Sequence, residues 1–218
     1  LDQNEIDTLK NLFYEWKDQI PNHDYLHKNI DPHGIYKFLN VGHTKHAWLI
    51  RTNNKVQKIF KSLWNTDELI VSFDGCCYIE KSNNKKDNCW THTDQAPNCK
   101  KFECYQGFIS LTDNKERTLV VYEGSHLLHK RYFEDSNDNS SKNWNLISEE
   151  YLNTIEDKKK VLNVKAGSLV LWDSRTFHQN QYGSPNCENR IVQYVCYLPR
   201  SHKKNTKSVS KKRQLYFD

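Results

Sequence analysis

The sequence predicts an α+β fold in which a layer of helices packs on a β-sandwich or barrel. Two observations support this prediction. The apolar residues recur at the helical period near 3.6 up to Asn65 and at the strand period of 2 beyond it. The 218 residues are 36% hydrophobic and 12% aromatic, which suffices for one sizeable core and excludes fibrous and wholly disordered classes.

Three helices are expected in the first 67 residues. The first is amphipathic, because one helical face carries the apolar residues Ile6, Leu9, Leu12, Phe13, Trp16 and Ile20. Pro21 is expected to end this helix. A second, short helix should follow Asp31-Pro32, since Asp is a good N-cap and Pro suits the first turn. The third is marked by the apolar positions Val56, Ile59, Phe60, Leu63 and Trp64.

Beyond Asn65, five runs rich in β-branched and aromatic residues are predicted to be strands. These runs cover residues 69–73, 107–111, 118–122, 169–172 and 191–197. The polar stretch from Glu134 to Asn145 is rich in Asn and Ser, so we expect an exposed loop there. Such a loop is either a tolerated insertion or a lid.

The formal charge of +5, from 32 basic and 27 acidic residues, is concentrated at one end of the chain. Residues 200–213 hold seven Lys and Arg and no acid, whereas residues 1–199 have a formal charge of −1. Such a basic run is typical of a solvated, partly disordered tail, and a role in nuclear localisation or nucleic-acid contact is the alternative. Nucleic acid is therefore expected as a partner only through residues 200–218.

Seven cysteines are an odd number in a chain large enough to fold without disulfides, which favours a reduced, intracellular protein. No apolar run approaches the ~20 residues that span a bilayer, and the first residues lack a signal-peptide pattern. We therefore expect a cytoplasmic location, or a nuclear one if the basic tail is a targeting signal, and no membrane partner. The sequence leaves the oligomeric state open.

The sharpest local feature is the segment Trp90-Thr91-His92-Thr93-Asp94-Gln95. Because residues i and i+2 of a strand point to the same face, His92 and Asp94 can offer an imidazole and a carboxylate to one point. His178, just past an apolar strand, would supply a second imidazole. Two histidines and one carboxylate on one face of a metal leave positions open, the arrangement with which non-haem Fe(II) binds an oxo-acid and O2.

Arg190 lies twelve residues after His178, across the turn-forming stretch 182–186, and opens the final strand. An antiparallel return would set its guanidinium beside the strand of His178, inside the barrel. A buried arginine needs a carboxylate partner, and the carboxylate of a bidentate cosubstrate meets that need.

At this point the sequence resembles the phytanoyl-CoA dioxygenase-like family of Fe(II)/2-oxoglutarate oxygenases. The resemblance is specific from Leu69 onward and looser over the helical residues 1–67. It rests on the segments His92-Thr93-Asp94-Gln95, Tyr105-Gln106-Gly107-Phe108, Leu111-Thr112-Asp113, Tyr122-Glu123-Gly124-Ser125-His126, and Gly167 to Arg175 with His178 and Arg190.

The resemblance implies a double-stranded β-helix core of the jelly-roll or cupin type with an N-terminal helical layer. It implies a single oxygenase domain over residues 1–199, mainly helical over 1–67 and β-helical over 68–199, followed by a basic tail over 200–218. The body of the chain would thus contain the whole catalytic unit.

The resemblance also implies the roles of individual residues. His92, Asp94 and His178 would ligate Fe(II), and Arg190 would pair with the distal carboxylate of 2-oxoglutarate. Secondary contacts to that cosubstrate would come from Thr118 and Tyr78.

The implied reaction consumes 2-oxoglutarate and O2, releases succinate and CO2, and oxidises a C–H bond of the substrate. Halogenating relatives are expected to replace the acidic ligand by a small residue, so the presence of Asp94 favours a hydroxylase. The expected substrate is a small molecule or an amino-acid side chain, and its identity is left open.

Two alternatives stand beside this interpretation. Cys89, Cys99 and Cys104 could form a structural zinc site with His92, but they lack a paired Cys-x-x-Cys and would take a ligand from the iron. The second alternative is a catalytically silent β-helix that acts as a binding or scaffold protein through its basic tail. The intact ligand set with Arg190 argues against it.

Overall fold

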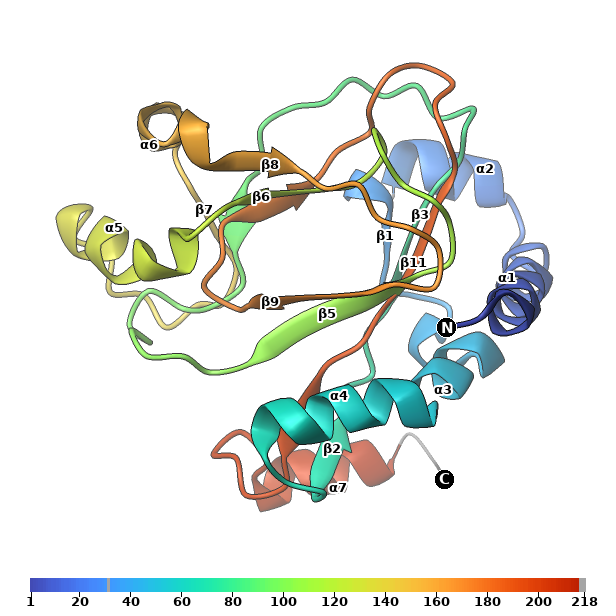
Figure 1. The fold of residues 1–218 in the computed structure, drawn as a ribbon, viewed down its shortest axis with the longest axis horizontal. Helices are drawn as coiled ribbons and strands as arrows, with labels where there is room; N and C mark the ends of the chain where they lie inside the picture. The colour runs from blue at the N-terminus through green and yellow to red at the C-terminus, as the bar shows by residue number, and fades with distance from the viewer. Residues whose placement is uncertain (31, 216–218) are drawn as a thin grey trace.

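The computed structural model describes residues 1–30 and 32–215, which are built around two facing antiparallel sheets of five strands (Figure 1). Sheet I contains, in spatial order, β1 (Ile35–Tyr36), β3 (Cys76–Ile79), β11 (Arg190–Tyr194), β5 (Tyr105–Ser110) and β9 (Leu169–Asp173). Sheet II contains β7 (Asn145–Leu146), β4 (His92–Thr93), β10 (His178–Asn180), β6 (Leu119–Tyr122) and β8 (Lys159–Val161). This arrangement confirms the predicted α+β class with a double-stranded β-helix core.

Helices cover the outer face of sheet I. They are α1 (Gln3–Lys17), α3 (Lys45–Arg51) and α4 (Asn54–Trp64). Phe13 of α1, Ile50 of α3 and Phe60 of α4 are completely buried in one cluster with Tyr78 and Ile191 of the sheet. The first and third predicted helices are therefore confirmed, although α1 ends at Lys17, before the predicted stop at Pro21.

The helix predicted after Asp31-Pro32 is not formed. Asp31 lies outside the described residues, and Pro32–Gly34 is a single 3-10 turn that leads directly into β1. His33 and Gly34 both have positive φ, 61° and 71°, which stops helical propagation. Gly34 also lies against β3, where a Cβ atom would meet Ile79 Cγ1 at 2.4 Å. Close packing on sheet I thus overrides the local helix signals.

Shorter elements complete the chain. α2 (His23–Tyr25) continues into a π-helical turn over Leu26–Ile30, and 3-10 turns occupy Val41–His43, Ser125–Leu127 and Glu156–Lys158. α5 (His129–Asp135) and α6 (Glu149–Thr154) pack through Phe133 and Leu152 against the cluster of Tyr122 and Phe177 beside sheet II. The expected loop begins within α5 and otherwise has no regular structure up to β7. No helix of the described residues combines the length and apolar character needed to cross a bilayer.

All five predicted strand regions contain strands, but the last is divided. β11 ends at Tyr194, and β12 (Tyr197–Pro199) then pairs with β2 (Leu69–Val71) in a separate small sheet. Between them, Val195 N donates to Gly107 O, and Cys196 O accepts from Ser72 N. The chain therefore leaves sheet I at Val195. The hydrogen bond between Ser72 and Cys196 then brings residues 72–75 and 196 together at one end of the barrel.

Side chains of β3 and β11 alternate between two environments. Tyr78 and Ile191 belong to the helix-side cluster, whereas Cys77 and Val192 belong to the cluster between the sheets. Because the strand period is 2, Arg190 shares the inward face of β11 with Val192 and Tyr194. This parity decides which predicted site residues can reach the interior.

The basic segment from Arg200 onward contains a helix and contacts the body of the protein. α7 (Lys207–Gln214) brings Arg213 over the ring of Phe73, 4.0 Å from its centroid, and Arg213 Nη2 donates to Val71 O at 2.6 Å. Lys203 and Lys204 pair with the carboxylate of Glu103 at 2.5 and 2.6 Å. The segment is therefore attached to the small β2–β12 sheet and to the loop before β5, rather than solvated throughout.

The Glu103 attachment should make stability depend on pH. Burial raises the pKa of Glu103, but Lys203 and Lys204 outweigh burial and lower it from 4.5 to about 2. Because the folded pKa lies below the unfolded value, the stabilisation is complete above about pH 4.5 and is lost as the pH falls toward 2. We expect Glu103→Gln to lower the free energy of unfolding by about 1 kcal/mol at pH 7.

Urea unfolding followed by circular dichroism between pH 7 and pH 2 would measure this difference. Glu134→Gln, which removes an exposed pair with Lys100, is the matched control and should have a much smaller effect. A Glu103→Gln deficit that stays constant down to pH 2 would contradict the assignment.

Candidate metal centre and its cavity

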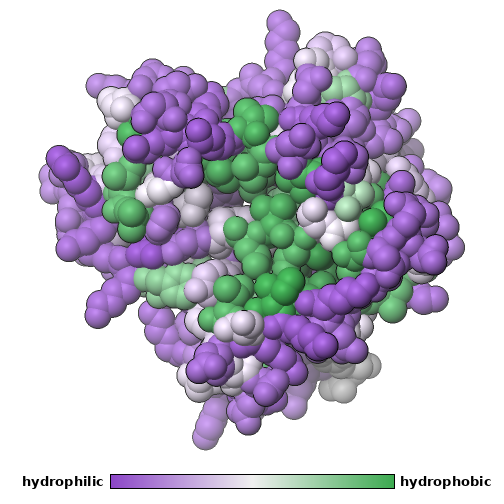
Figure 2. Space-filling view, in the orientation of Figure 1, coloured by the Kyte–Doolittle hydropathy of each residue, from purple (hydrophilic) through white to green (hydrophobic). Residues whose placement is uncertain are grey.

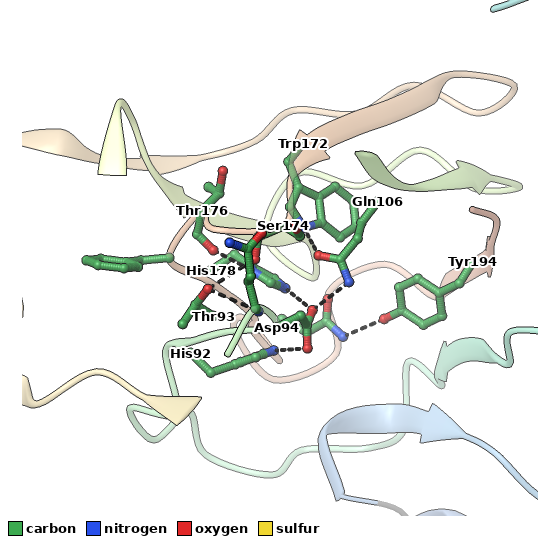
Figure 3. Close-up of polar contacts among 12 residues, drawn as sticks. His92, Thr93, Asp94, Gln106, Trp172, Ser174, Thr176, His178 and Tyr194 are labelled. Atoms are coloured by element: carbon green, nitrogen blue, oxygen red, sulfur yellow. Dashed lines mark hydrogen bonds and ion pairs between the residues drawn. The ribbon is translucent and has the colours of Figure 1, made fainter. Parts of the chain in front are cut away.

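Three side chains that can ligate a metal meet at the inner face of sheet II. His92 on β4 and His178 on β10 are direct register partners, and their ring centroids lie 4.4 Å apart. Asp94 follows β4 in a bend; its Oδ1 lies 3.6 Å from His92 Nε2 and its Oδ2 lies 3.4 Å from His178 Nε2. One ligand atom of each residue falls within 4.8 Å of the others. Figure 3 shows both imidazoles pointing at the carboxylate of Asp94.

The second nitrogen of each imidazole fixes its orientation. His92 Nδ1 lies 3.1 Å from Trp90 O, and His178 Nδ1 lies 2.9 Å from Thr176 O. A carbonyl oxygen can only accept, so each Nδ1 carries the proton and each Nε2 presents a free lone pair to Asp94. Two Nε2 atoms and a carboxylate are a suitable donor set for a divalent transition metal.

The protonation states agree with this arrangement. Burial lowers the pKa of His92 to about 3, with a further contribution from His178, so the imidazole is neutral at physiological pH. Burial alone would raise the pKa of Asp94, but its polar surroundings, with the neighbouring imidazoles and the hydrogen bond from Gln106 Nε2, hold it below its usual value. His92 is therefore neutral and Asp94 ionised, the forms in which each can ligate a cation.

Gln106 holds the carboxylate from the opposite sheet. Its Nε2 donates to Asp94 Oδ2 at 2.9 Å, and its Oε1 accepts from Trp172 Nε1 at 3.1 Å. Gln106 and Trp172 are register partners on β5 and β9 of sheet I. The resemblance marked the segment of Gln106 without assigning it a role, and only the pairing of distant strands brings it to Asp94.

A cavity of about 320 Å³ opens beside the cluster. Its walls combine the three potential metal ligands with aromatic side chains, including Trp90, Trp144, Trp172 and Tyr194. Trp144 comes from the predicted loop and lies 5.4 Å from the ring of His92. In the orientation of Figure 1, Figure 2 shows hydrophobic side chains gathered near the centre of the face in view, within a hydrophilic rim. The volume is near the lower limit for small-molecule sites.

Arg190 is completely buried behind this cavity. Its Nη2 donates to Asn180 Oδ1 at 2.9 Å, and its guanidinium carbon lies 5.2 Å from the centroid of the Phe108 ring. Nε and Nη1 have no hydrogen-bond partner among the described residues. Asn180 and Tyr194, which hydrogen-bond to each other at 3.1 Å, line the cavity directly in front of it. A buried cation with two free donors needs an anionic ligand.

The structure does not bring the two predicted secondary contacts to the cavity. Tyr78 points to the helix side of β3, where its ring lies 5.2 Å from that of Phe13. The hydroxyl of Thr118 donates to Leu162 O at 2.8 Å, and neither residue lines the cavity. Strand parity explains why the side chain of Tyr78 points away from the cavity, because its neighbour Cys77 takes the inward position.

The alternative zinc site is not assembled either. Within the described residues, the His92-Asp94-His178 cluster is the one group of three potential ligands close enough to share a metal. Cys104 lines the cavity, whereas Cys89 is exposed and Cys99 Sγ lies 3.8 Å from Lys101 O.

Comparison with known proteins places this fold in a defined class. No family model matches the chain. In structure it is similar to GlcNAc Inducible Gene 2, GIG2 (DUF1479), of Candida albicans, with a TM-score of 0.70 and 17% identity, over 91% of this chain but only 59% of that one. EctD of S. alaskensis, solved with 2-oxoglutarate and 5-hydroxyectoine, has a TM-score of 0.62 and 15% identity over 93% of this chain and 70% of EctD.

HygX of Streptomyces hygroscopicus, solved with nickel and 2-oxoglutarate, has a TM-score of 0.61 and 11% identity over 92% of this chain and 80% of HygX. The fold is thus that of the non-haem iron, 2-oxoglutarate-type oxygenases. In sequence, 212 residues are 30% identical to Ava biosynthesis cluster protein O of Aspergillus versicolor, covering 90% of this chain and 68% of that protein. The chain belongs to the family of that protein.

The cluster predicts a measurable response to metal. We expect Co(II) or Ni(II) at about a hundred times its Kd to raise the free energy of unfolding by about 3 kcal/mol. His178→Ala should abolish this gain, because one imidazole and the carboxylate no longer enclose the ion. His126→Ala, in the Ser125–Leu127 turn outside the cluster, is the control. Equal stabilisation of both variants in a thermal or urea unfolding assay would show that the metal binds elsewhere.

Proposed function

We propose that this protein is an Fe(II)/2-oxoglutarate-dependent dioxygenase that hydroxylates a small molecule. One observation carries the proposal: the His92-Asp94-His178 cluster shares its cavity wall with Asn180, behind which the buried Arg190 has two free guanidinium donors. The pairing of a facial metal site with an enclosed cation suits a metal-bound dicarboxylate.

Each residue has a distinct task in this proposal. Nε2 of His92, Nε2 of His178 and a carboxylate oxygen of Asp94 would hold Fe(II), and Gln106 keeps that carboxylate turned toward the imidazoles. Arg190 would bind the distal carboxylate of 2-oxoglutarate through Nε and Nη1, with Asn180 steadying the guanidinium. When bound, Fe(II) and 2-oxoglutarate supply O2 activation coupled to decarboxylation to succinate. The aromatic walls exclude water and position the substrate.

The finer assignment rests on Asp94. A carboxylate at this position occupies the site that a halide would need, which supports hydroxylation rather than halogenation. The motifs from Leu69 onward support placing the chain with the phytanoyl-CoA dioxygenase-like oxygenases. We propose that residues 1–199 form the catalytic domain and that the segment 200–218 is accessory to it.

The dimensions of the cavity favour a small-molecule substrate over a polymer. Family membership with a biosynthesis cluster protein is consistent with this substrate class. The basic charge lies on the C-terminal segment, so any contact with nucleic acid would be confined to residues 200–218. An intracellular location is proposed from the reduced cysteines.

Arg190→Lys tests the cosubstrate site. Lysine keeps the charge but loses the fork of donors, so we expect 2-oxoglutarate to bind about 10- to 100-fold more weakly while Fe(II) affinity is unchanged. Anaerobic calorimetric titration of the metal-free protein with Fe(II), and then of the metal-loaded protein with 2-oxoglutarate, would measure both. Arg175→Lys, whose guanidinium is held by Asp173, is the control and should bind 2-oxoglutarate normally.

The competing function is a silent β-helix that acts as a binding or scaffold protein. Failure of the native chain to bind Fe(II) and 2-oxoglutarate would favour that alternative. So would binding that is undiminished in the double variant His92→Ala with Asp94→Ala. Succinate formation on turnover would eliminate it.

A further inference from the structure

A carboxylate that the proposed chemistry does not use lies in the wall of the same cavity. Asp74 follows β2 and lines the cavity together with Ser72, Cys104 and Cys196. The hydroxyl of Ser72 donates to Asp74 Oδ2. No donor to Oδ1, and no ion pair to either oxygen, occurs among the side chains that the structure describes.

Two arginines lie near Asp74, but they are committed to backbone oxygens. Arg51 Nη2 donates to the main-chain carbonyl of Asp74 at 2.8 Å, and its Nη1 donates to Gly42 O. Arg213 donates to Val71 O and covers the ring of Phe73. Both arginines therefore shape the loop that presents Asp74 without neutralising its carboxylate by direct contact.

The ionised form of the Asp74 side chain is disfavoured by its surroundings. Burial raises the pKa of Asp74, and this effect outweighs the hydrogen bond from Ser72 and the charge of Arg51; the negative charge of Asp94 adds to it. A carboxylate that is largely removed from solvent and has one hydrogen-bond donor is stabilised by any cation that enters the cavity and completes its hydrogen bonds.

Asp74 stands at the opposite end of β11 from Arg190. Tyr194 N donates to Gly75 O at 3.2 Å, so Asp74 lies beyond the last residue of that strand. Arg190 and Tyr194 are four residues, or about 13 Å, apart at the usual rise of a strand. The proposed cosubstrate anchor and Asp74 thus lie at opposite ends of β11, and the cavity reaches from Asp74 past the three potential metal ligands to Asn180, which contacts Arg190.

We propose that Asp74 binds a protonated amine of the substrate, so that the substrate class is a compact, largely apolar or aromatic small molecule with one cationic nitrogen. The identification of the bound amine as part of the substrate rests on the proposed function. Trp90, Trp172 and Tyr194 supply the apolar walls, and Lys37 is the other charged residue outside the metal cluster that lines the cavity among the described residues. With Asp74 at one end, the amine would orient the apolar body past the metal centre.

The test uses the full chain kept free of metal with a chelator, so that an amine cannot bind to the metal itself. The probes are 2-phenylethylamine, neutral 2-phenylethanol and anionic 3-phenylpropanoate, with affinities measured by ligand-observed NMR. We expect the amine to bind about tenfold or more tightly than either of the others. Equal or absent binding of the amine overturns the proposal without any variant.

Asp74→Asn keeps the shape and removes the charge, and it should abolish the preference for the amine. Ser72→Ala removes the donor to Oδ2 but keeps the charge, so the preference should persist. Asp67→Asn, an exposed carboxylate paired with Lys61, is the control and should behave as the native chain. A preference for the amine that survives in a folded Asp74→Asn variant overturns the proposal.

Separate titrations with Ni(II) and 2-oxoglutarate distinguish the two levels of inference. If both ligands bind but the amine preference is missing, the role of Asp74 fails and the proposed function stands. If the amine preference depends on Asp74 while neither ligand binds, the recognition of a cation stands and the oxygenase function fails. Normal stabilisation of Asp74→Asn by Ni(II) would show that the substitution leaves the metal centre intact.

Discussion

The antiparallel register between β4 and β10 is the constraint on which the rest of the site depends. It sets His178 directly opposite His92, and the same strand pairs on its other side with β6. A slip of β10 by one residue would turn His178 to the outer face of sheet II, away from His92. The carbonyl oxygens of Trp90 and Thr176 then fix the ring orientation. Gln106 ties the carboxylate of Asp94 to the other sheet, so the cluster also holds the two sheets in mutual alignment.

Much of the fold was predictable because the two periods are strong signals. The amphipathic α1 and α4 and the five strand regions follow from local patterns, and the ligand cluster follows from the His-x-Asp spacing with a histidine on a neighbouring strand. β3 was not predicted, since Cys76–Ile79 is buried on both faces and shows no alternation. The missing second helix has the same origin, because packing of Gly34 on Ile79 is a tertiary contact.

The limits of sequence reasoning are clearest for residues defined by strand parity and register. Tyr78 is adjacent to an inward position but faces the helices, and nothing within its own segment reveals which side will be covered. Gln106, Asn180 and Asp74 reach the cavity through pairings between strands that are distant in sequence. The twelve-residue spacing to Arg190 was informative because residues 181–189 cross directly from β10 of sheet II to β11 of sheet I, which leaves Arg190 within hydrogen-bond distance of Asn180 on β10.

Comparison of two buried arginines helps to separate structure from ligand binding. All three donor groups of Arg117 are occupied, by the main-chain oxygens of Tyr182, Glu80 and Asn83. Arg190 is equally buried, yet two of its nitrogens have no partner among the described residues. The first arginine stabilises loops; the second has unused bonding capacity beside a cavity. The contrast supports the proposed anion-binding role of Arg190 rather than a general tolerance of buried charge.

The attachment of the C-terminal helix α7 gives it an influence on the shape of the cavity. Through Arg213 it holds Val71 and Phe73, and these residues lead directly to Asp74. The ligand cluster, in contrast, is built on β4 and β10 of sheet II. Changes in α7 can therefore reshape the far end of the cavity while the metal ligands stay as they are. Under the proposed function, the two ends of the cavity are separable for natural divergence: the Asp74 end could change with the substrate while the ligand cluster is kept.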